Sequence, residues 1–324
     1  MTSNVPSPIM PSLNKPLRVI VSENVSNLPE EDSDISFIYQ PDLWQYPEKL
    51  SRNIQDADGL IIRNQTQVDA ALLTNAKKLR VIGRLGAGLD NIDIQAARAA
   101  GVQVVYSPDA NTTSVAEYCL AQILNIIRVL PEAMHSTSSG DWLRTQFTGR
   151  ELSEIVIGLV GFGRIAQALA ERLDYLGGKI IIATRSPEKV PRSFDTGSLD
   201  ELIKEADIIS LHVPGGLETK HLIGSPQFKT MKPTAWLLNT SRGSVVDEKA
   251  LHTALVSGKI AGAVVDVREN EPPVAGILET LPNLYTTPHI AAFTSAAQAR
   301  VEKTVFADVV AVLNGDHPQG LVLS

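Results

Sequence analysis

The chain has 324 residues, of which 44% are hydrophobic and 20% charged, and its formal net charge is -7. This length predicts two domains, and the composition supplies apolar material for two packed cores and excludes a mainly disordered chain. The negative charge argues against nucleic acid as a partner, and no apolar run approaches the roughly 20 residues of a membrane span. A single cysteine, Cys119, excludes an internal disulfide and favours a reducing compartment, so we expect a cytoplasmic protein without a membrane partner.

The first 16 residues are rich in Pro, Ser and Asn and lack a basic start leading into an apolar stretch, so we expect a flexible lead-in and not a signal peptide. From residue 17 onward, apolar runs alternate with helical patterns, which is typical of parallel α/β construction. The first block of predicted strands comprises Leu17–Val21, Gly59–Ile62, Arg80–Ile82 and Val102–Tyr106. The helices predicted with them are Val68–Leu79, Ile92–Ala100 and Thr113–Leu130, the last ending before Pro131.

A second strand–helix series follows a polar stretch that runs from His135 to Leu152. Its predicted strands are Glu154–Val160, Lys179–Ala183, Ala206–Leu211, Ala235–Leu238, Ala261–Asp266 and Leu284–Thr286. A final helix is predicted over Ser295–Leu313. The strands and helices together predict a parallel α/β protein.

A glycine-rich turn lies between the first strand of this second series and the helical pattern after it. The turn has the spacing Gly161-x-Gly163-x-x-Ala166. The first glycine allows the tight bend, the second lets a pyrophosphate approach the backbone, and the small alanine permits close helix–strand packing. The helix start at Arg164 and Ile165 adds N–H groups and the positive end of the helix dipole. The segment therefore predicts a dinucleotide site.

The residues after the next strand bear on which nicotinamide cofactor fits. An acidic residue there would hydrogen-bond the adenosine ribose of NAD, but the sequence has Thr184, Arg185 and Ser186. A guanidinium and two hydroxyls could bind the 2′-phosphate of NADP. The sequence therefore favours NADP with NAD as a possibility, and the alternative is that Arg185 is a solvated loop cation.

Three short segments near the C-terminal end carry residues suited to moving a hydride to or from a carbonyl beside a carboxylate. Arg242 can stabilise an oxyanion, His289 can exchange a proton near neutral pH, and Glu271 can hold and bias that imidazole. Taken singly, each residue has a structural alternative. Arg242 could form a surface ion pair, His289 could be a core histidine, and Glu271 could be a solvated carboxylate. Their occurrence together, after a nucleotide-binding turn, favours catalysis. We predict no metal site.

With these motifs, the chain from about residue 17 to its end resembles the D-isomer-specific 2-hydroxyacid dehydrogenases, the family of phosphoglycerate, glyoxylate/hydroxypyruvate and D-lactate dehydrogenases. The resemblance implies a Rossmann NAD(P)-binding domain over residues 111–293. It also implies a discontinuous, flavodoxin-like substrate-binding domain over residues 17–110 and 294–324, with the active site in the cleft between the two. An exchanged arm at about 135–152 would make the protein a homodimer.

The resemblance also implies roles for single residues. It makes Arg242, Glu271 and His289 the catalytic residues. It gives Val213, Pro214, Thr240 and Asp266 to the cofactor, the last near the nicotinamide carboxamide. In the loop Gly86–Asn91, the N–H groups of Ala87 and Gly88 would bind the substrate carboxylate, although a purely structural turn is the alternative there.

The substrate is less narrowly predicted. In the phosphoglycerate branch, basic residues near Arg63, and one from a partner subunit that corresponds to Arg144, meet the distal phosphate. Gln65 stands where that branch would carry a second arginine. We therefore expect an NADP-preferring reductase of glyoxylate, hydroxypyruvate or an anionic 2-oxo acid. The alternatives are an NAD-dependent phosphoglycerate-type dehydrogenase and a nucleotide-sensing module like the C-terminal-binding corepressors; Glu271 argues against a formate dehydrogenase.

Overall fold

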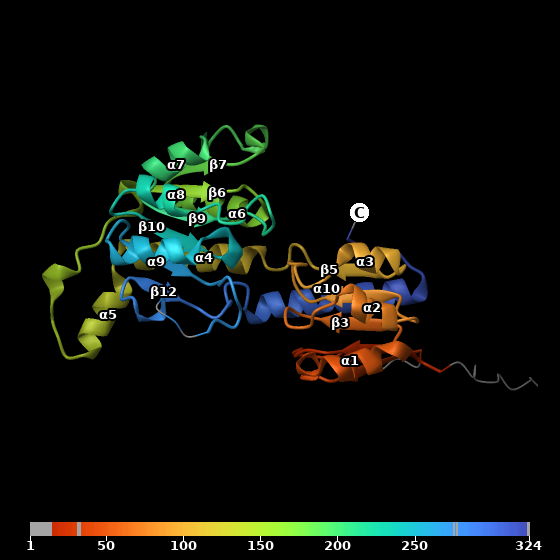
Figure 1. Cartoon of the computed structure of the whole chain (residues 1–324). Helices are drawn as coiled ribbons and strands as arrows, with labels where there is room; N and C mark the ends of the chain where they lie inside the picture. Colours follow the sequence, from red (N-terminus) through yellow and green to blue (C-terminus); the bar gives the residue numbers. More distant parts are fainter. Residues whose placement is uncertain (1–14, 31–33, 275, 277, 323–324) are drawn as a thin grey trace, which may run out of the picture. The chain divides into compact units, whose positions relative to one another are not determined.

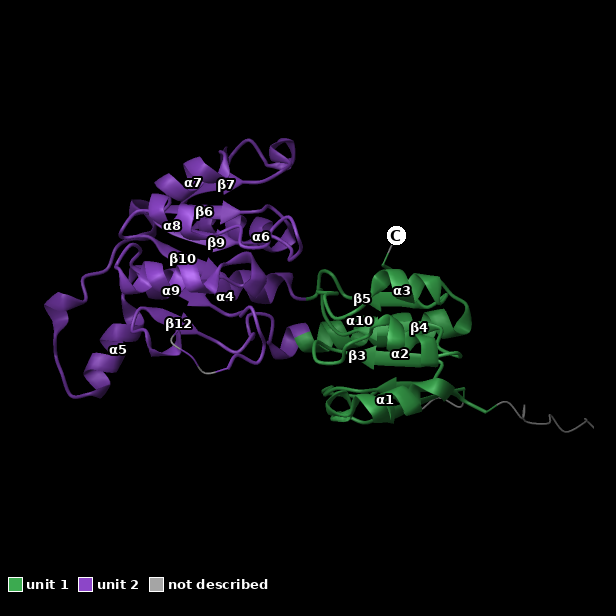
Figure 2. Ribbon diagram, in the orientation of Figure 1, with its two compact units in different colours: residues 1–110, 298–324 green, residues 111–297 purple. Residues whose placement is uncertain are grey.

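The structure is a computed structural model that describes residues 15–30, 34–274, 276 and 278–322 (Figure 1). The chain divides into two compact units, which Figure 2 colours separately. Unit 1 consists of Met1–Ala110 and Gln298–Ser324, and unit 2 consists of Asn111–Ala297. Most of the expected lead-in, residues 1–14, lies outside the described residues.

Unit 1 is built on a five-stranded parallel sheet in the order β2-β1-β3-β4-β5. The strands are β1 (Leu17–Val21), β2 (Ile35–Tyr39), β3 (Gly59–Ile62), β4 (Val81–Arg84) and β5 (Gln103–Tyr106). This strand order is that of the flavodoxin-like sheet. All four residues of β3 are buried, as expected for the central strand of a sheet that is covered on both faces.

Helices cover this sheet with two apolar layers. The helices of unit 1 are α1 (Pro47–Asn53), α2 (Ala70–Asn75), α3 (Ile94–Ala99) and most of α10 (Ser295–Asn314). Side chains of α1, α2 and α3 share one buried cluster, and those of α10 share the other. Asp69 and Asp93 cap α2 and α3 by accepting from Leu72 N and Ala96 N at 2.8 and 2.9 Å.

Unit 2 contains a seven-stranded parallel sheet in the order β12-β11-β10-β9-β6-β7-β8. Its strands are β6 (Val156–Val160), β7 (Lys179–Ala183), β8 (Asp195–Thr196), β9 (Ile208–Leu211), β10 (Trp236–Asn239), β11 (Gly262–Val265) and β12 (Leu284–Thr286). Numbered along the chain from β6, the order from the β8 edge is 3-2-1-4-5-6-7, the Rossmann arrangement with one added strand. The two parallel sheets confirm the predicted α/β fold class.

The helices of unit 2 cover both faces of this sheet. They are α4 (Thr112–Ile127), α6 (Arg164–Tyr175), α7 (Leu199–Glu205), α8 (Ser225–Thr230) and α9 (Glu248–Val256), whereas α5 (Leu130–Ser138) buries none of its residues. Buried side chains of α4 and α6 form one apolar cluster with the sheet, and those of α7, α8 and α9 form the other. In doubly wound sheets, ligands bind at the carboxyl ends of the strands.

The helix predicted over Thr113–Leu130 is wrong in one respect, because the structure has two helices there. Helix α4 ends at Ile127, and α5 begins at Leu130 with Pro131 in its first turn. Between them Val129 adopts a left-handed conformation with φ 53°, which ends the first helix. Proline is tolerated in a first turn because its missing N–H has no intrahelical partner there.

No single helix among those described is long and apolar enough to cross a membrane. Helices α4 and α5 together pass a test of length and composition, but they are bent by 65°. The buried residues of α4 pack into the core of unit 2.

Candidate active site

The glycine turn lies at the carboxyl end of β6 and leads into α6. Gly161 has φ 92°, and a Cβ there would lie 2.4 Å from the carbonyl oxygen of His212, so no other residue fits without movement. A Cβ at Gly163, the N-cap of α6, would meet no atom within 4 Å, and no side chain caps the helix. Ala166 in the first turn of α6 is fully buried. An open helix start with a glycine at its N-cap suits the pyrophosphate of a dinucleotide.

Thr184, Arg185 and Ser186 follow the end of β7. The guanidinium of Arg185 lies 2.5 Å from a carboxylate oxygen of Glu218, and both side chains are 80% exposed. The hydroxyl of Thr184 accepts from the backbone N–H of Ser186 at 3.3 Å. Arg185, the residue predicted to bind a 2′-phosphate, is thus an exposed cation that forms an ion pair with Glu218.

Other residues predicted at the cofactor follow the ends of β9 and β10. Val213 and Pro214 come directly after His212, whose Nε2 lies 2.8 Å from the hydroxyl of Ser210; burial lowers the pKa of His212 to about 4. Thr240 follows β10, and its hydroxyl lies 3.3 Å from the sulfur of Cys119. Burial raises the pKa of Cys119 to about 12, so this thiol stays protonated at neutral pH.

Arg242 follows the end of β10 in a short structured turn. The amide of Asn239 donates to the carbonyl oxygen of Arg242 at 3.0 Å and accepts from the backbone N–H and hydroxyl of Ser241 at 3.0 and 2.8 Å. The guanidinium of Arg242 also donates to the carbonyl of Ser241 at 2.7 Å. The buried Asn239 therefore fixes the backbone that carries this cation.

Glu271 and His289 come together in unit 2. Nδ1 of His289 lies 2.7 Å from Oε2 of Glu271, and the other carboxylate oxygen accepts from the backbone N–H of Arg268 at 3.0 Å. Burial by itself would raise the pKa of Glu271, but the hydrogen bonds from His289 and Arg268 and the charges of His289 and Arg242 lower it below its ordinary value. The structure thus holds an ionised carboxylate against the imidazole.

Asp266 anchors the loop that carries His289. This residue is 1% exposed, and its carboxylate accepts from the hydroxyl of Thr287 and from the backbone N–H groups of Ile290 and Ala291 at 2.5, 2.8 and 2.8 Å. Its carbonyl oxygen accepts from the N–H of His289 at 2.8 Å, and His289 itself has φ 56°. These contacts position the histidine; the predicted contact of Asp266 with nicotinamide stays a prediction.

The remaining predicted substrate residues lie elsewhere in the chain. Ala87 and Gly88, both half-buried, lie in the loop after β4 in unit 1. Arg63 follows β3; its side chain is 14% exposed, and its guanidinium lies 2.7 Å from Glu302. Arg63 also donates to Gln298 and, at 2.5 Å, to the carbonyl of Asn24, so its donors are engaged inside unit 1. Arg144 is exposed in the segment after α5.

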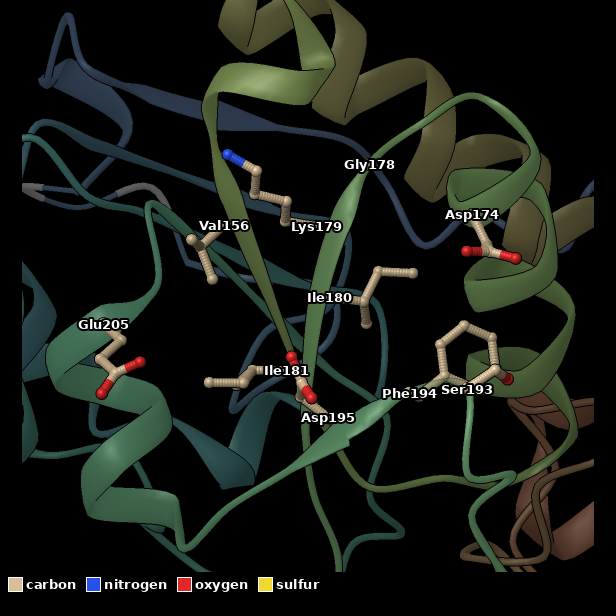
Figure 3. Close-up of a pocket in the computed structure, with 10 residues that line it drawn as sticks. All are labelled: Val156, Asp174, Gly178, Lys179, Ile180, Ile181, Ser193, Phe194, Asp195 and Glu205. Atoms are coloured by element: carbon tan, nitrogen blue, oxygen red, sulfur yellow. The ribbon is translucent and has the colours of Figure 1, made fainter.

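A separate hollow of about 310 Å³ lies at the amino-terminal edge of the unit 2 sheet (Figure 3). The first residues of β6, β7 and β8, namely Val156, Lys179 and Asp195, line it, together with Asp174 and Glu205. It contains none of the predicted site residues. Within the described parts of the chain, no His, Cys, Asp and Glu residues gather in a group that could hold a metal.

Two residues important for the site's geometry were not predicted. Arg268, in the loop between Asp266 and Glu271, binds Glu248 at the start of α9 through two hydrogen bonds of 2.8 and 3.1 Å. Their separation of 20 positions gives no local signal in the sequence. Only the fold brings them together.

Comparisons with known proteins show which family the chain resembles. Residues 120–291 match the model of the D-isomer specific 2-hydroxyacid dehydrogenase NAD binding domain. The chain is 41% identical over 279 residues to a D-3-phosphoglycerate dehydrogenase of Methanocaldococcus jannaschii, covering 85% of this chain and 53% of the relative. It is 39% identical over 303 residues to a glyoxylate reductase of Thermococcus litoralis, covering 89% of this chain and 92% of the relative.

A solved structure is also similar. The NADPH-dependent glyoxylate/hydroxypyruvate reductase SmGhrB of Sinorhizobium meliloti, in complex with NADP and malonate, superposes with a TM-score of 0.83 at 28% identity, covering 95% of this chain and 97% of that one. The chain therefore belongs to the D-isomer-specific 2-hydroxyacid dehydrogenase family. It spans about half the length of the phosphoglycerate dehydrogenase relative, and nearly all of the glyoxylate reductase relative.

Proposed function

We propose that this protein is an NADP-preferring reductase of small 2-oxo acids, with Arg242, Glu271 and His289 as its catalytic residues. The observation that carries the proposal is the contact of 2.7 Å between His289 Nδ1 and Glu271 Oε2, beside the charge of Arg242. A cation, an imidazole and an ionised carboxylate can together stabilise the oxyanion and deliver the proton in the reduction of a carbonyl.

Each of the three residues has its own role in the proposed reaction. A bound nicotinamide would supply the hydride, and the carbonyl oxygen of the substrate would then gain negative charge. The guanidinium of Arg242 stabilises that charge, and His289 delivers a proton to the oxygen from Nε2. Because Glu271 accepts from Nδ1, it favours the protonated ring and aims Nε2 at the substrate.

The cofactor would bind along the carboxyl edge of the unit 2 sheet. Gly161, Gly163 and the start of α6 would hold the pyrophosphate, and the open space at Gly163 supports this assignment. Arg185 would bind the 2′-phosphate of NADP, exchanging its contact with Glu218 for the stronger phosphate contact. The reductase SmGhrB, whose structure contains NADP, gives this preference a precedent in the family.

For the substrate we favour glyoxylate or hydroxypyruvate, which have no second anionic group. The N–H groups of Ala87 and Gly88 would bind the carboxylate. Arg63, the residue expected to meet a distal anion, is instead engaged by Glu302. The phosphoglycerate dehydrogenase relative supports the alternative, an NAD-dependent dehydrogenase of a phosphorylated acid.

A panel assay distinguishes the two functions. The oxidation of NADPH and of NADH is followed with glyoxylate, hydroxypyruvate, pyruvate, oxaloacetate, sulfopyruvate and phosphohydroxypyruvate, each at several concentrations. We expect the highest kcat/KM with NADPH and glyoxylate or hydroxypyruvate. A preference for NADH and phosphohydroxypyruvate would establish the alternative, and no turnover with any pair would favour a nucleotide-sensing role.

We further propose that the protein works in the cytoplasm as a homodimer. The segment at about 135–152 would be the exchanged arm, and Trp142 within it is 83% exposed in the single chain. Met134 in helix α5 is also 67% exposed. Apolar side chains exposed this far suit burial against a second copy.

A further inference from the structure

Arg268 lies in the loop that carries Glu271, and carboxylates enclose its guanidinium. Nε and Nη2 bind the two oxygens of Glu248 at 2.8 and 3.1 Å, and Nη1 binds Glu279. The side chain of Arg268 is only 11% exposed, and that of Glu248 is 23% exposed. A bidentate pair of this kind fixes both direction and distance, which a single ammonium group could not do.

The same pair fixes the backbone around Arg268. One oxygen of Glu248 also accepts from the N–H of Glu269 at 2.9 Å. The N–H of Arg268 points to Glu271 and donates to its Oε1 at 3.0 Å. Glu248 therefore binds both the side chain of Arg268 and the backbone N–H of Glu269. The backbone N–H of Arg268 is directed to Glu271 instead.

The other side of this loop is also held in place. A Cβ added to Gly243, the residue after Arg242, would lie 1.9 Å from the carbonyl carbon of Arg268. The backbone that carries Arg242 and the backbone that leads to Glu271 are thus in direct contact. Glu248 is itself fixed, because it begins α9, which Asp247 caps by accepting from two backbone N–H groups at 3.0 Å.

We propose that Arg268, held by Glu248, is a positioning residue that aims the Glu271 carboxylate at Nδ1 of His289. The inference rests on the proposed function, because it assigns Glu271 and His289 to the reaction. It goes further in predicting that the ion pair selects the tautomer of the histidine. With Glu271 in place, the neutral ring carries its proton on Nδ1, and Nε2 is left to exchange a proton with the substrate.

A merely structural role for Arg268 would predict a loss of stability and nothing more. A positioning role predicts that folded variants lose the Nδ1–H tautomer and lose kcat. The hydrogen bonds of Glu248 outweigh burial and raise the pKa of Arg268, so the cation persists at every working pH. Substitution, and not titration, is therefore the way to remove it.

The experiment compares Arg268→Met, Arg268→Lys and Glu248→Gln with the unaltered protein. Ring ¹⁵N chemical shifts, recorded at alkaline pH on cofactor-free protein and assigned with His289→Ala, report the tautomer of His289 without any need for turnover. Steady-state assays give kcat and KM, and thermal unfolding shows that each variant is folded. Arg172→Met is the matched control, because Arg172 on α6 lies 3.9 Å from Glu117 on α4, in a pair far less buried than that of Arg268 and Glu248.

For Arg268→Met we expect a mixture of tautomers and a fall in kcat of about tenfold, with KM for the cofactor little changed, since displacements of about 1 Å can cost up to about a hundredfold. Arg268→Lys should be intermediate, Glu248→Gln should resemble Arg268→Met, and Arg172→Met should match the unaltered protein. If Arg268→Met does not fold, the other two variants decide.

Folded variants that keep the tautomer and the kcat of the unaltered protein would overturn the inference. The proposed function fails in a different way, namely if His289→Ala keeps its activity. The tautomer comparison is still valid in that case, so the two failures can be told apart.

Discussion

His289 and Glu271 face one another at 2.7 Å, and each is anchored by the backbone of the same loop. The N–H of His289 donates to the carbonyl oxygen of Asp266, and the N–H of Arg268 donates to Glu271. Asp266 and Arg268 are two positions apart. One short segment after β11 therefore fixes both partners. This explains how the imidazole of His289, which is partly exposed to solvent, can keep a defined orientation.

Glu271→Gln should keep the shape of the site but remove its charge. We expect kcat for reduction to fall by about 10²-fold, at the low end of general acid–base effects. Glu269→Gln is the matched control, since Glu269 contacts a different histidine, His221, at the same 2.7 Å. Equal activity of the two variants would contradict the assignment of Glu271.

Arg185→Ala should weaken NADPH binding and affect NADH little, because only NADPH has a 2′-phosphate. A charge-assisted contact contributes roughly 1.5–3 kcal/mol, or about tenfold to a hundredfold in affinity. Thr184→Asp should act in the same direction. Glu218→Gln should strengthen NADPH binding slightly, since exposed ion pairs contribute about 0–1 kcal/mol. Fluorescence titrations measure each affinity; an unchanged ratio of NADPH to NADH affinity in Arg185→Ala would remove the NADP proposal and leave the reductase proposal standing.

Asp207→Asn should lower stability in a pH-dependent way. Burial alone would raise the pKa of Asp207, but the N–H of Val156 at 2.9 Å and the ammonium of Lys232 at 3.2 Å, with the charge of Arg150, lower it. The folded protein thus favours the ionised form, and this stabilisation is present above about pH 4 and is lost as the pH falls through the lowered value.

The measurement is urea unfolding of Asp207→Asn and of the unaltered protein at several pH values. The expected difference is about 1–3 kcal/mol at neutral pH, and it should shrink on acidification. Asp195→Asn, an exposed position on the edge strand β8, serves as the control. A difference that stays constant from neutral to strongly acidic pH would show that the charge of Asp207 is not the cause.

The proposed dimer depends on the arm. Light scattering at micromolar concentration should give the mass of two chains, and Trp142→Ala should weaken the association because it removes a large apolar side chain. Comparing the kcat of the dissociated Trp142→Ala variant with that of the dimer should also show whether Arg144 of one subunit contributes to turnover in the other. A stable monomer of the unaltered protein would refute the arm, and with it any role of Arg144 in a partner's site.

Much of the fold could be predicted because its strands carry strong local signals. Strands β1, β3, β7 and β12 begin and end where apolar, mostly β-branched runs predicted them. Strand β2 was not predicted, since Ile35–Tyr39 follows an acidic stretch, lies at the edge of its sheet and is mostly half-buried. Helix α2 is shorter than Val68–Leu79 because Asp69 caps it and Ala76 ends it. Tertiary contacts determine where such elements begin and end, and the spacing of apolar residues in the sequence does not reveal these contacts.

The candidate site shows the same division. Arg242, Glu271 and His289 lie in short motifs, so the sequence could bring them forward as a group. The engagement of Arg63 by Glu302 and of Arg268 by Glu248 depends on residues far away in the chain. Such ion pairs follow from the packing of helices and strands, and for Arg63 the pairing changes which substrate is expected.

The most direct test of the proposed function is His289→Ala. The variant removes the proton donor and leaves the glycine turn intact, so NADPH affinity by fluorescence titration should be unchanged while kcat with glyoxylate falls by about 10²–10⁴-fold. Comparable turnover of His289→Ala and the unaltered protein, at saturating NADPH and glyoxylate, would contradict the proposed reaction.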